Sequence, residues 1–270
     1  MQHPSVIERF AYSARRVTRT LDNRDGTTTQ QIGGTAFVVA HPCGDTNVGF
    51  LVTASHVIWP KLGSDKPDVR RTIGLTLESH ESAGGRAYEQ AQVEIDTSAW
   101  PEPTEDGVSV FPAEASSGVV SGGYKSIIVS SDLWSRNDFE ESGFIGREVI
   151  VAGYPDSILP DGATPRPIIS SGVIASDPRW SAGVARRTSE HSALYQGFSW
   201  SGMSGAPVLA QQVGMSSSAT INFSGSLPAG VIGVSFGHVQ AVDSNHSSWS
   251  GLFPSWLILD KLAEYETAMT

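Results

Sequence analysis

Cysteine is nearly absent from this sequence: Cys43 is the single one in 270 residues, so no disulfide can form within the chain. Small secreted domains often depend on several disulfides, and their absence favours a reducing compartment. The first residues lack the basic-then-apolar pattern of a secretory signal, although removal of a leader would leave the same sequence. No apolar run approaches the length of a membrane span. We therefore expect a soluble, cytoplasmic protein with no membrane partner.

Basic residues are also scarce. Lys and Arg total 18 against 28 Asp and Glu, which gives a net charge of −10. The basic residues gather in no more than short runs, such as residues 15–16 and 186–187. Proteins that bind nucleic acids need a basic surface for the phosphates, so we expect no nucleic-acid partner.

Metal and phosphate motifs are missing as well. The seven histidines are scattered, and the sequence contains neither His-Glu-x-x-His nor a pair of cysteines. The pair Gly33 and Gly34 is not followed by the Lys-Ser/Thr of a phosphate-binding loop. We therefore expect no metal and no cofactor.

What the sequence has in abundance is turn residues, with 28 Gly and 15 Pro, and enough apolar residues (39%) to fill a core. Short runs of β-branched and aromatic residues lie between these turns, which predicts an all-β barrel or sandwich. The expected strands are residues 35–40, 49–53, 71–77, 91–95, 108–111, 126–129, 148–152, 167–175, 206–210, 219–223 and 230–236.

The two ends of the chain differ from this pattern. Residues 1–30 are polar and are expected to form an N-terminal extension, with a short helix or an edge strand within 6–21. Residues 255–270 are expected to form a C-terminal helix, because Ser255 can cap it after a proline and four apolar residues share one face. These residues are Trp256, Ile258, Leu259 and Leu262. Residues 211–228 are expected to form an exposed insertion, and residues 98–107 and 156–166 to form loops.

Two segments carry residues suited to acyl chemistry. His56 ends the apolar run 49–54, and Ser204 lies between glycines in residues 202–207, Gly-Met-Ser-Gly-Ala-Pro. A serine hydroxyl attacks an acyl carbon when an imidazole removes its proton and N–H groups receive the oxyanion. Taken alone, each residue has a simpler reading: His56 as a half-buried histidine at a strand end and Ser204 as a turn residue.

Taken together, these segments closely resemble the chymotrypsin-like serine proteases. In that family a histidine follows a Thr-Ala-small run, as in residues 53–56, and a serine lies in Gly-x-Ser-Gly-small-Pro, as in residues 202–207. Residues 153–155, Gly-Tyr-Pro, resemble a turn of the bacterial members. Residues 171–174 and 233–237 resemble the strand after that turn and the strand that lines the substrate cleft. The similarity spans about residues 30–265, in the family's order.

The resemblance implies two packed six-stranded antiparallel β-barrels with a C-terminal helix and an active site in the seam. The first barrel, residues 31–120, would carry His56, and the second, residues 121–254, would carry Ser204. By the same resemblance, Ser204 is the nucleophile, His56 is the base, and the N–H groups of Gly202 and Ser204 form the oxyanion hole.

The third member of a Ser-His-Asp triad is less clear, because the family places an aspartate directly before a short strand. Here that strand starts at Val108, so the position falls on Gly107 unless the register shifts by one or a bulge intervenes. In that case Asp106 supplies the carboxylate, and we predict Asp106. The alternative is that Asp106 is a solvated turn residue. Asp96 and Asp132 are poorer candidates because neither precedes such a strand.

Substrate preference is expected to come from six residues. By position, Phe198 and Ser199 would lie near the base of a pocket and Ser235, Phe236 and Gly237 along its wall, with His238 beside it. No aspartate lies near Phe198 to bind a basic side chain, so we expect an apolar or small side chain before the cleaved bond. An acidic preference through His238 is the alternative.

Met203 stands where the digestive members carry an aspartate that pairs with a newly cleaved N-terminus. Met203 cannot form that ion pair, so we expect no activation by N-terminal trimming. The thioether of Met203 is expected to pack beneath the loop.

The resulting hypothesis is a serine endopeptidase that acts on a protein or peptide substrate without a cofactor. The alternative from another class is a protease-fold binding module that has lost turnover, if Gly107 occupies the aspartate position. Acyl transfer or ester hydrolysis by the same site is a third possibility. The sequence does not indicate an oligomeric state.

Overall fold

The computed structural model describes residues 6–23, 25–60, 71–83, 87–103, 105–113, 128–141, 145–156, 166–180, 191–211, 229–239 and 249–269. The strand predicted at 219–223 and nearly all of the insertion predicted at 211–228 lie outside these ranges. None of the helices within them is both long enough and apolar enough to cross a membrane.

The N-terminal module is a curled seven-stranded sheet with the strand order β5-β4-β1-β2-β3-β6, to which β7 adds by pairing with β2. Neighbouring strands are antiparallel except β2 and β7, which are parallel. The strands are β1 (Ala14–Asp22), β2 (Thr28–Cys43), β3 (Thr46–Ala54), β4 (Arg71–Ala83), β5 (Ala87–Asp96), β6 (Val108–Pro112) and β7 (Ile128–Val129).

The C-terminal module is a closed antiparallel barrel with the strand order β10-β13-β12-β11-β8-β9. Closure leaves no open edge on this sheet. The strands are β8 (Glu148–Gly153), β9 (Ile168–Ile174), β10 (Ala193–Gly197), β11 (Pro207–Ala210), β12 (Gly230–His238) and β13 (Trp249–Pro254).

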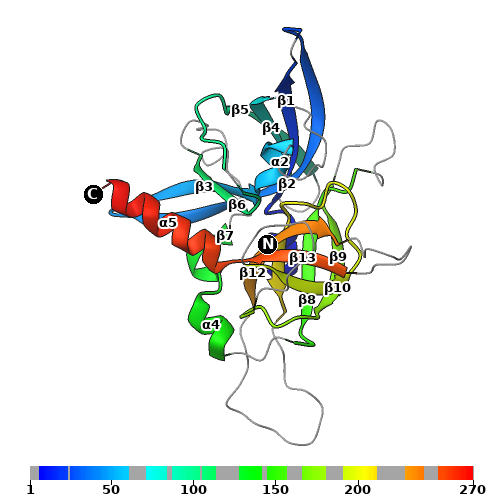
Figure 1. Cartoon of the computed structure of the whole chain (residues 1–270), viewed down its shortest axis with the longest axis vertical. Coiled ribbons are helices and arrows are strands. Elements are labelled where there is room, and N and C mark those ends of the chain that lie inside the picture. The colour runs from blue at the N-terminus through cyan, green and yellow to red at the C-terminus, as the bar shows by residue number, and fades with distance from the viewer. Residues whose placement is uncertain are drawn as a thin grey trace, which may run out of the picture.

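The helices in the described part of the chain are short apart from the last. They are α1 (Val6–Ala11), α2 (Ser55–Ile58), the 3-10 helix η2 (Ser130–Asp132), α4 (Arg136–Glu141) and α5 (Trp256–Met269). The helix α5 leaves the barrel after β13 and runs along the N-terminal sheet, where it packs against β6 (Figure 1). Thus α5 links the two modules.

The predicted fold class is confirmed: the described chain is mostly β, with a closed six-stranded barrel and a C-terminal helix. The N-terminal module is the more open of the two. The segment 1–30, predicted as an extension, contributes β1, which pairs with both β2 and β4 and therefore lies inside the sheet. The strand β7, which follows the boundary predicted at residue 120, also joins this sheet.

The predicted apolar face of α5 is buried. Ile258 and Leu262 are fully buried, and the ring of Tyr265 packs edge-on against Phe50 of β3, with 4.9 Å between centroids. Ser255 lies at the start of the helix, but its hydroxyl donates to Trp134 O at 2.7 Å and does not cap the helix. The hydroxyl therefore holds the helix against the segment before α4.

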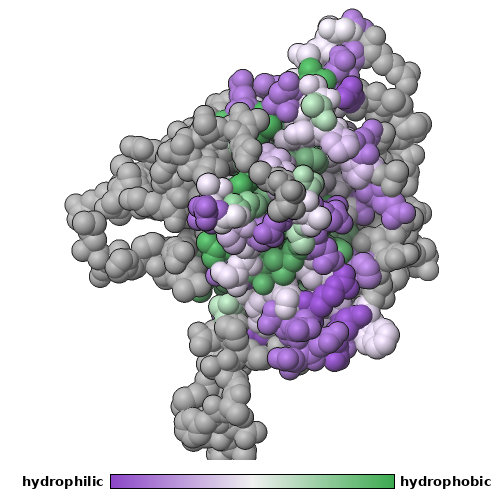
Figure 2. Space-filling view, turned by 90° about the vertical axis from the view of Figure 1, so that its left-hand side faces the viewer, coloured by the Kyte–Doolittle hydropathy of each residue, from purple (hydrophilic) through white to green (hydrophobic). Residues whose placement is uncertain are grey.

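Two strands are buried along nearly their whole length, β3 from Val48 to Ala54 and β12 from Gly230 to Gly237. The two strands contact each other across the junction of the modules. Continuous apolar runs of this kind are typical of strands covered on both sides. On the face shown in Figure 2, by contrast, hydrophobic surface forms small patches between hydrophilic areas.

Thr35 of β2 joins the two modules by hydrogen bonds. Its N–H donates to Ser204 O (2.8 Å), its hydroxyl donates to Gly202 O (2.8 Å), and the same hydroxyl accepts the N–H of Tyr154 (3.0 Å). Thr35 is fully buried. A buried hydroxyl with both a donor and an acceptor partner fixes the segments that it joins.

Replacing Thr35 by valine should therefore destabilise the protein. Valine keeps the shape but leaves one buried carbonyl and one buried N–H without a partner, which we expect to lower the free energy of unfolding by about 2–5 kcal/mol. Chemical denaturation measures this. The control is Thr28→Val, at an exposed position of the same strand, with an expected change within about 0.5 kcal/mol. Equal effects of the two substitutions would contradict the role of Thr35.

Candidate active site

Antiparallel pairing of β3 with β6 brings His56 and Asp106 to the same end of the ladder. Ala54 is paired with Val108, and the strands run in opposite directions. His56, two residues after Ala54, therefore lies beside Asp106, two residues before Val108. Gly107, which lies between Asp106 and Val108, pairs with Ser55: its carbonyl accepts the N–H of Ser55 at 2.8 Å. The carboxylate that meets His56 is therefore that of Asp106.

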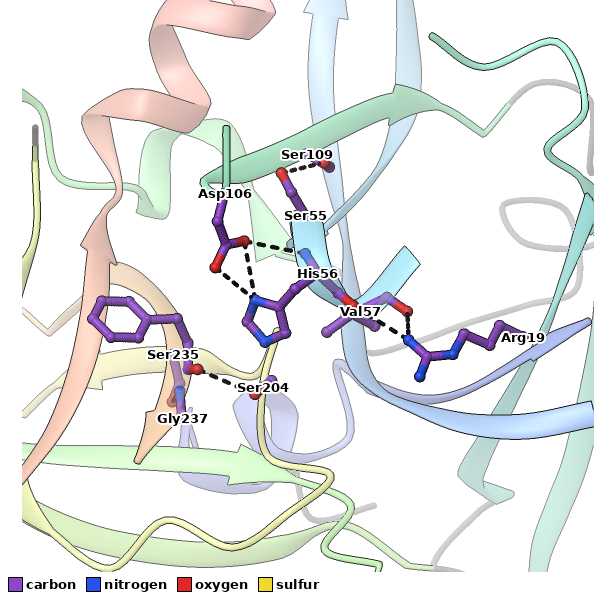
Figure 3. Close-up of polar contacts among 10 residues, drawn as sticks. Arg19, Ser55, His56, Val57, Asp106, Ser109, Ser204, Ser235 and Gly237 are labelled. Atoms are coloured by element: carbon purple, nitrogen blue, oxygen red, sulfur yellow. Dashed lines mark hydrogen bonds and ion pairs between the residues drawn. The ribbon is translucent and has the colours of Figure 1, made fainter. Parts of the chain in front are cut away.

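The contact between His56 and Asp106 involves both carboxylate oxygens. The ring atom Nδ1 lies 3.0 Å from Oδ1 and 2.9 Å from Oδ2, and the main-chain N–H of His56 donates to Oδ1 at 3.1 Å (Figure 3). The side chain of Asp106 is 4% exposed and that of His56 is 12% exposed. A carboxylate so buried favours a proton on Nδ1, which leaves Nε2 free to act as a base.

The helical turn that carries His56 is held at its carbonyl end by β1 and β4. Arg19 Nη1 donates to the carbonyls of His56 and Val57, each at 3.3 Å, and the hydroxyl of Thr72 donates to Ile58 O. Carbonyls at the end of a helix have no partner within it, so outside donors are needed when they are buried. Arg19, which is 7% exposed, provides them from the first strand of the chain.

The loop that carries Ser204 has five consecutive carbonyls that are hydrogen-bonded. The carbonyl oxygens of residues 200–204 accept, in order, the N–H of Met203, the N–H of Asp156, the hydroxyl of Thr35, the N–H of Ala206 and the N–H of Thr35. Glycine is required at 202 and 205, where φ is +93° and +87°. Met203 is fully buried beneath the loop, as predicted.

Two N–H groups of this loop point elsewhere. Met203 N–H and Gly205 N–H donate to Trp200 O and Ser235 O. The N–H groups of Gly202 and Ser204, in contrast, have no acceptor in the part of the chain that the structure describes. They are the two donors that the sequence predicted for an oxyanion.

The hydroxyl of Ser204 donates to Phe236 O at 3.2 Å (Figure 3). No other hydrogen bond of this hydroxyl is found among the described residues, and the His56 ring does not form a hydrogen bond with it. Gly237 adjoins the hydroxyl so closely that an added Cβ would lie 2.9 Å from Oγ. The imidazole of His56 points toward Ser204 in this view.

The residues predicted for the base of a pocket lie in different environments. Phe198 is 73% exposed and stacks on Trp200, with 6.2 Å between centroids. The hydroxyl of Ser199 is buried. The structure thus turns Phe198 toward solvent and Ser199 inward.

The residues predicted for the pocket wall follow β12. Ser235 is fully buried, and its hydroxyl is 3.1 Å from that of Tyr195, whose pKa burial raises above its ordinary value. Phe236 is buried against Phe253, with 4.7 Å between centroids. Gly237 lies beside Ser204, whereas His238 is exposed.

The other carboxylates considered lie in local turns. Asp96 accepts the N–H of Ser98 at 2.8 Å, and hydrogen bonds from the side chain and main chain of Ser98 lower the pKa of Asp96. Asp132 accepts the N–H of Val129 at 3.2 Å. No group of three or more His, Cys, Asp and Glu side chains within the described ranges is arranged to hold a metal ion.

Three residues around the site were missed in the sequence. Arg19 lies in a strand whose many polar residues do not show a strand pattern. Thr35 is one of many threonines in the sequence. Asp156 lies in a segment expected to be a loop. A signal existed for Asp156, since it directly follows the Gly-Tyr-Pro turn. Nothing in the sequence marks Arg19 or Thr35, because their partners are distant along the chain.

Comparison with known proteins gives a relation in fold. No family model matches the sequence, and no curated protein matches it. Among solved structures, the HtrA-type protease AlgW with a decapeptide is similar, with a TM-score of 0.52 and 12% sequence identity. The similarity covers 95% of this chain and 65% of the AlgW chain. The chain thus has a protease-like fold and spans about two thirds of the length of this neighbour.

The close contact of the Ser204 loop with β2 predicts the effect of Gly205→Ala. An added Cβ would overlap Thr35 O and Thr53 Oγ1, at a φ of +87° that already strains alanine. Gly146→Ala is the matched control, because its φ is +84° and nothing lies within 4 Å of the added Cβ. We expect a loss of unfolding free energy of about 1 kcal/mol for Gly146→Ala and more than about 3 kcal/mol for Gly205→Ala. Similar losses in the two variants would show that crowding at residue 205 is unimportant.

Proposed function

We propose that this chain is a serine endopeptidase that cleaves peptide bonds through an acyl-enzyme. The observation that carries the proposal is the buried carboxylate of Asp106 on Nδ1 of a histidine whose ring faces the Ser204 loop. The protease-like fold supports it. The decapeptide bound by the HtrA-type neighbour supports a peptide as the substrate.

In the proposed reaction Ser204 Oγ attacks the carbonyl carbon of the substrate while His56 Nε2 takes the hydroxyl proton. Asp106 keeps the imidazole in the correct tautomer and stabilises the imidazolium that forms. The N–H groups of Gly202 and Ser204 receive the oxyanion. The imidazolium then donates its proton to the leaving amine, and water attacks the acyl-enzyme by the same path with His56 again as the base.

The bond from Ser204 to Phe236 O represents the resting state in this proposal. A rotation about χ1 of Ser204 carries the hydroxyl from that carbonyl toward His56 Nε2. Such rotations of a side chain take picoseconds to nanoseconds, so the rotation does not limit turnover. A substrate carbonyl placed beside Ser204 Oγ would favour the rotated state.

For the side chain before the cleaved bond we propose a small or apolar group. The residues predicted for the pocket contribute hydroxyls and aromatic rings, and none of them is acidic. A basic substrate side chain would find no charge partner among them, and unpaired burial of a charge is costly.

The second candidate function is a binding module without turnover. Its supporting observation is the same bond from Ser204 to Phe236 O, since it keeps the hydroxyl off the imidazole. The position of Gly107, which motivated this alternative in the sequence, no longer supports it, because Asp106 contacts His56. Reactivity of Ser204 distinguishes the two functions.

A fluorophosphonate probe should label the wild-type protein covalently, because this reagent phosphonylates activated serines. Ser204→Ala should abolish labelling while the melting temperature changes little, since the hydroxyl is not a packing group. The control, Ser98→Ala at an exposed serine distant in sequence, should be labelled like the wild type. A well-folded wild-type protein that resists labelling at every pH between 6 and 9 would refute the endopeptidase and favour the binding module.

Asp106→Asn should slow labelling strongly, because the amide stabilises the wrong tautomer of His56. In chymotrypsin-like enzymes this change lowers kcat about 10⁴-fold, and we expect about 10³–10⁴ here. Asp96→Asn, at the exposed carboxylate that the sequence offered as an alternative, serves as the control and should leave the rate unchanged. Unchanged reactivity in Asp106→Asn would remove Asp106 from the mechanism.

A further inference from the structure

Asp156, in the segment that follows β8, forms two hydrogen bonds with the loop that carries Ser204. Its N–H donates to Ser201 O at 2.8 Å, and its Oδ2 accepts the hydroxyl of Ser201 at 2.8 Å. Ser201 is thus held through both its main chain and its side chain. The segment that carries Asp156 is itself held in place, because the N–H of Tyr154 donates to the hydroxyl of Thr35 in the N-terminal sheet. The two hydrogen bonds of Asp156 to Ser201 are called the grip below.

This grip determines where the N–H of Gly202 points. In a planar trans peptide unit the C=O and the N–H point in opposite directions, and the described chain has no cis peptide bond. The carbonyl of Ser201 is turned toward residue 156, so the N–H of Gly202 is turned away from it. On that side, no acceptor among the described residues meets the N–H.

The peptide unit between Ser201 and Gly202 needs such a grip because its own backbone does not fix it. Glycine accepts either sign of φ, so at Gly202, with φ +93°, the unit can flip at little local cost. Asp156 packs directly against the unit: a Cβ added to Gly202 would lie 2.5 Å from Asp156 Oδ1. A flip would break the hydrogen bond from Asp156 N–H to Ser201 O. The bond from the Ser201 hydroxyl to the carboxylate lies outside the peptide unit, and it holds residue 156 where its N–H reaches that carbonyl.

We propose that Asp156 is a positioning residue that fixes this peptide unit and thereby aims one of the two oxyanion donors. The inference rests on the proposed function, because it assigns Gly202 N–H to the oxyanion. A flipped unit would present the carbonyl of Ser201 in place of the N–H, and a carbonyl oxygen repels an oxyanion. The Asp156–Ser201 pair therefore holds the site in its reactive form.

The test uses the full chain and two reagents, p-nitrophenyl acetate and its thiono analogue, in which sulfur replaces the carbonyl oxygen. Asp156→Ala should slow the acylation burst with the oxygen ester about tenfold or more, since an ill-aimed donor stabilises the oxyanion less. Sulfur accepts hydrogen bonds weakly, so the thiono ester should lose less. The rate with the oxygen ester divided by the rate with the thiono ester should therefore fall. A general loss of structure would slow both reactions and would not change this ratio.

Two variants serve as controls. Asp156→Asn keeps an oxygen for the hydroxyl of Ser201 and should restore the rate to within about threefold of the wild type. Asp138→Ala removes a matched pair on α4, where Ser135 donates to the carboxylate at 2.7 Å, and should leave rate and ratio unchanged. If Asp156→Ala does not fold, Ser201→Ala removes the same hydrogen bond from the other side and takes its place.

The possible results separate the two proposals. A wild-type burst that vanishes in Ser204→Ala, together with wild-type rate and ratio in Asp156→Ala and Ser201→Ala, would overturn the role of Asp156 and leave the endopeptidase standing. A wild-type protein that shows no more burst than Ser204→Ala would overturn the proposed function and the role of Asp156 with it. A slower burst with a lower ratio, rescued by asparagine, supports both.

Discussion

The site depends on the attachment of one loop of the barrel to one residue of the N-terminal sheet. Thr35 bonds the carbonyls of Gly202 and Ser204, and it receives Tyr154 from the segment after β8. Three segments that are distant in sequence thus meet at Thr35: its own strand, the Ser204 loop and the segment of Tyr154. The hydroxyl and the N–H of Thr35 make the bonds. Because His56 lies in the turn that directly follows β3, and β3 pairs with the strand of Thr35, the bonds that hold the Ser204 loop also fix its position relative to the imidazole.

This attachment also sets the orientation of the N–H groups of Gly202 and Ser204. All carbonyls of residues 200–204 are bonded, so the orientation of each peptide unit is set from outside the loop. Since N–H and C=O point in opposite directions within each unit, fixing the carbonyls also aims the donors. The N–H groups of Gly202 and Ser204, like those of Trp200 and Ser201, meet no protein acceptor in the described chain. The orientation of the two donors that we propose for the oxyanion is therefore a consequence of how the carbonyls are satisfied.

The sequence predicted the parts of this arrangement that have local causes. Apolar runs predicted β3 and β12, and the glycines on both sides of Ser204 predicted a turn there. The sequence does not decide on β1 because this strand carries Arg15 and Arg19, both of which are buried here. Arg15 donates to the nearby carbonyl of Ala14, whereas Arg19 donates to the distant carbonyl of His56. The strands β10 and β13 were not predicted, since each is short and contains glycine.

The choice between Asp106 and Gly107 shows why the remaining uncertainty could not be resolved in the sequence. Both residues lie directly before β6, and a shift of one place exchanges their roles. The register is set by pairing with β3, which makes Gly107 O the acceptor for Ser55 N–H and leaves the Asp106 side chain to His56. Glycine suits its place because it offers only its main chain there. The carboxylate that binds the imidazole is therefore determined by a ladder between strands, and no motif within residues 105–111 contains that information.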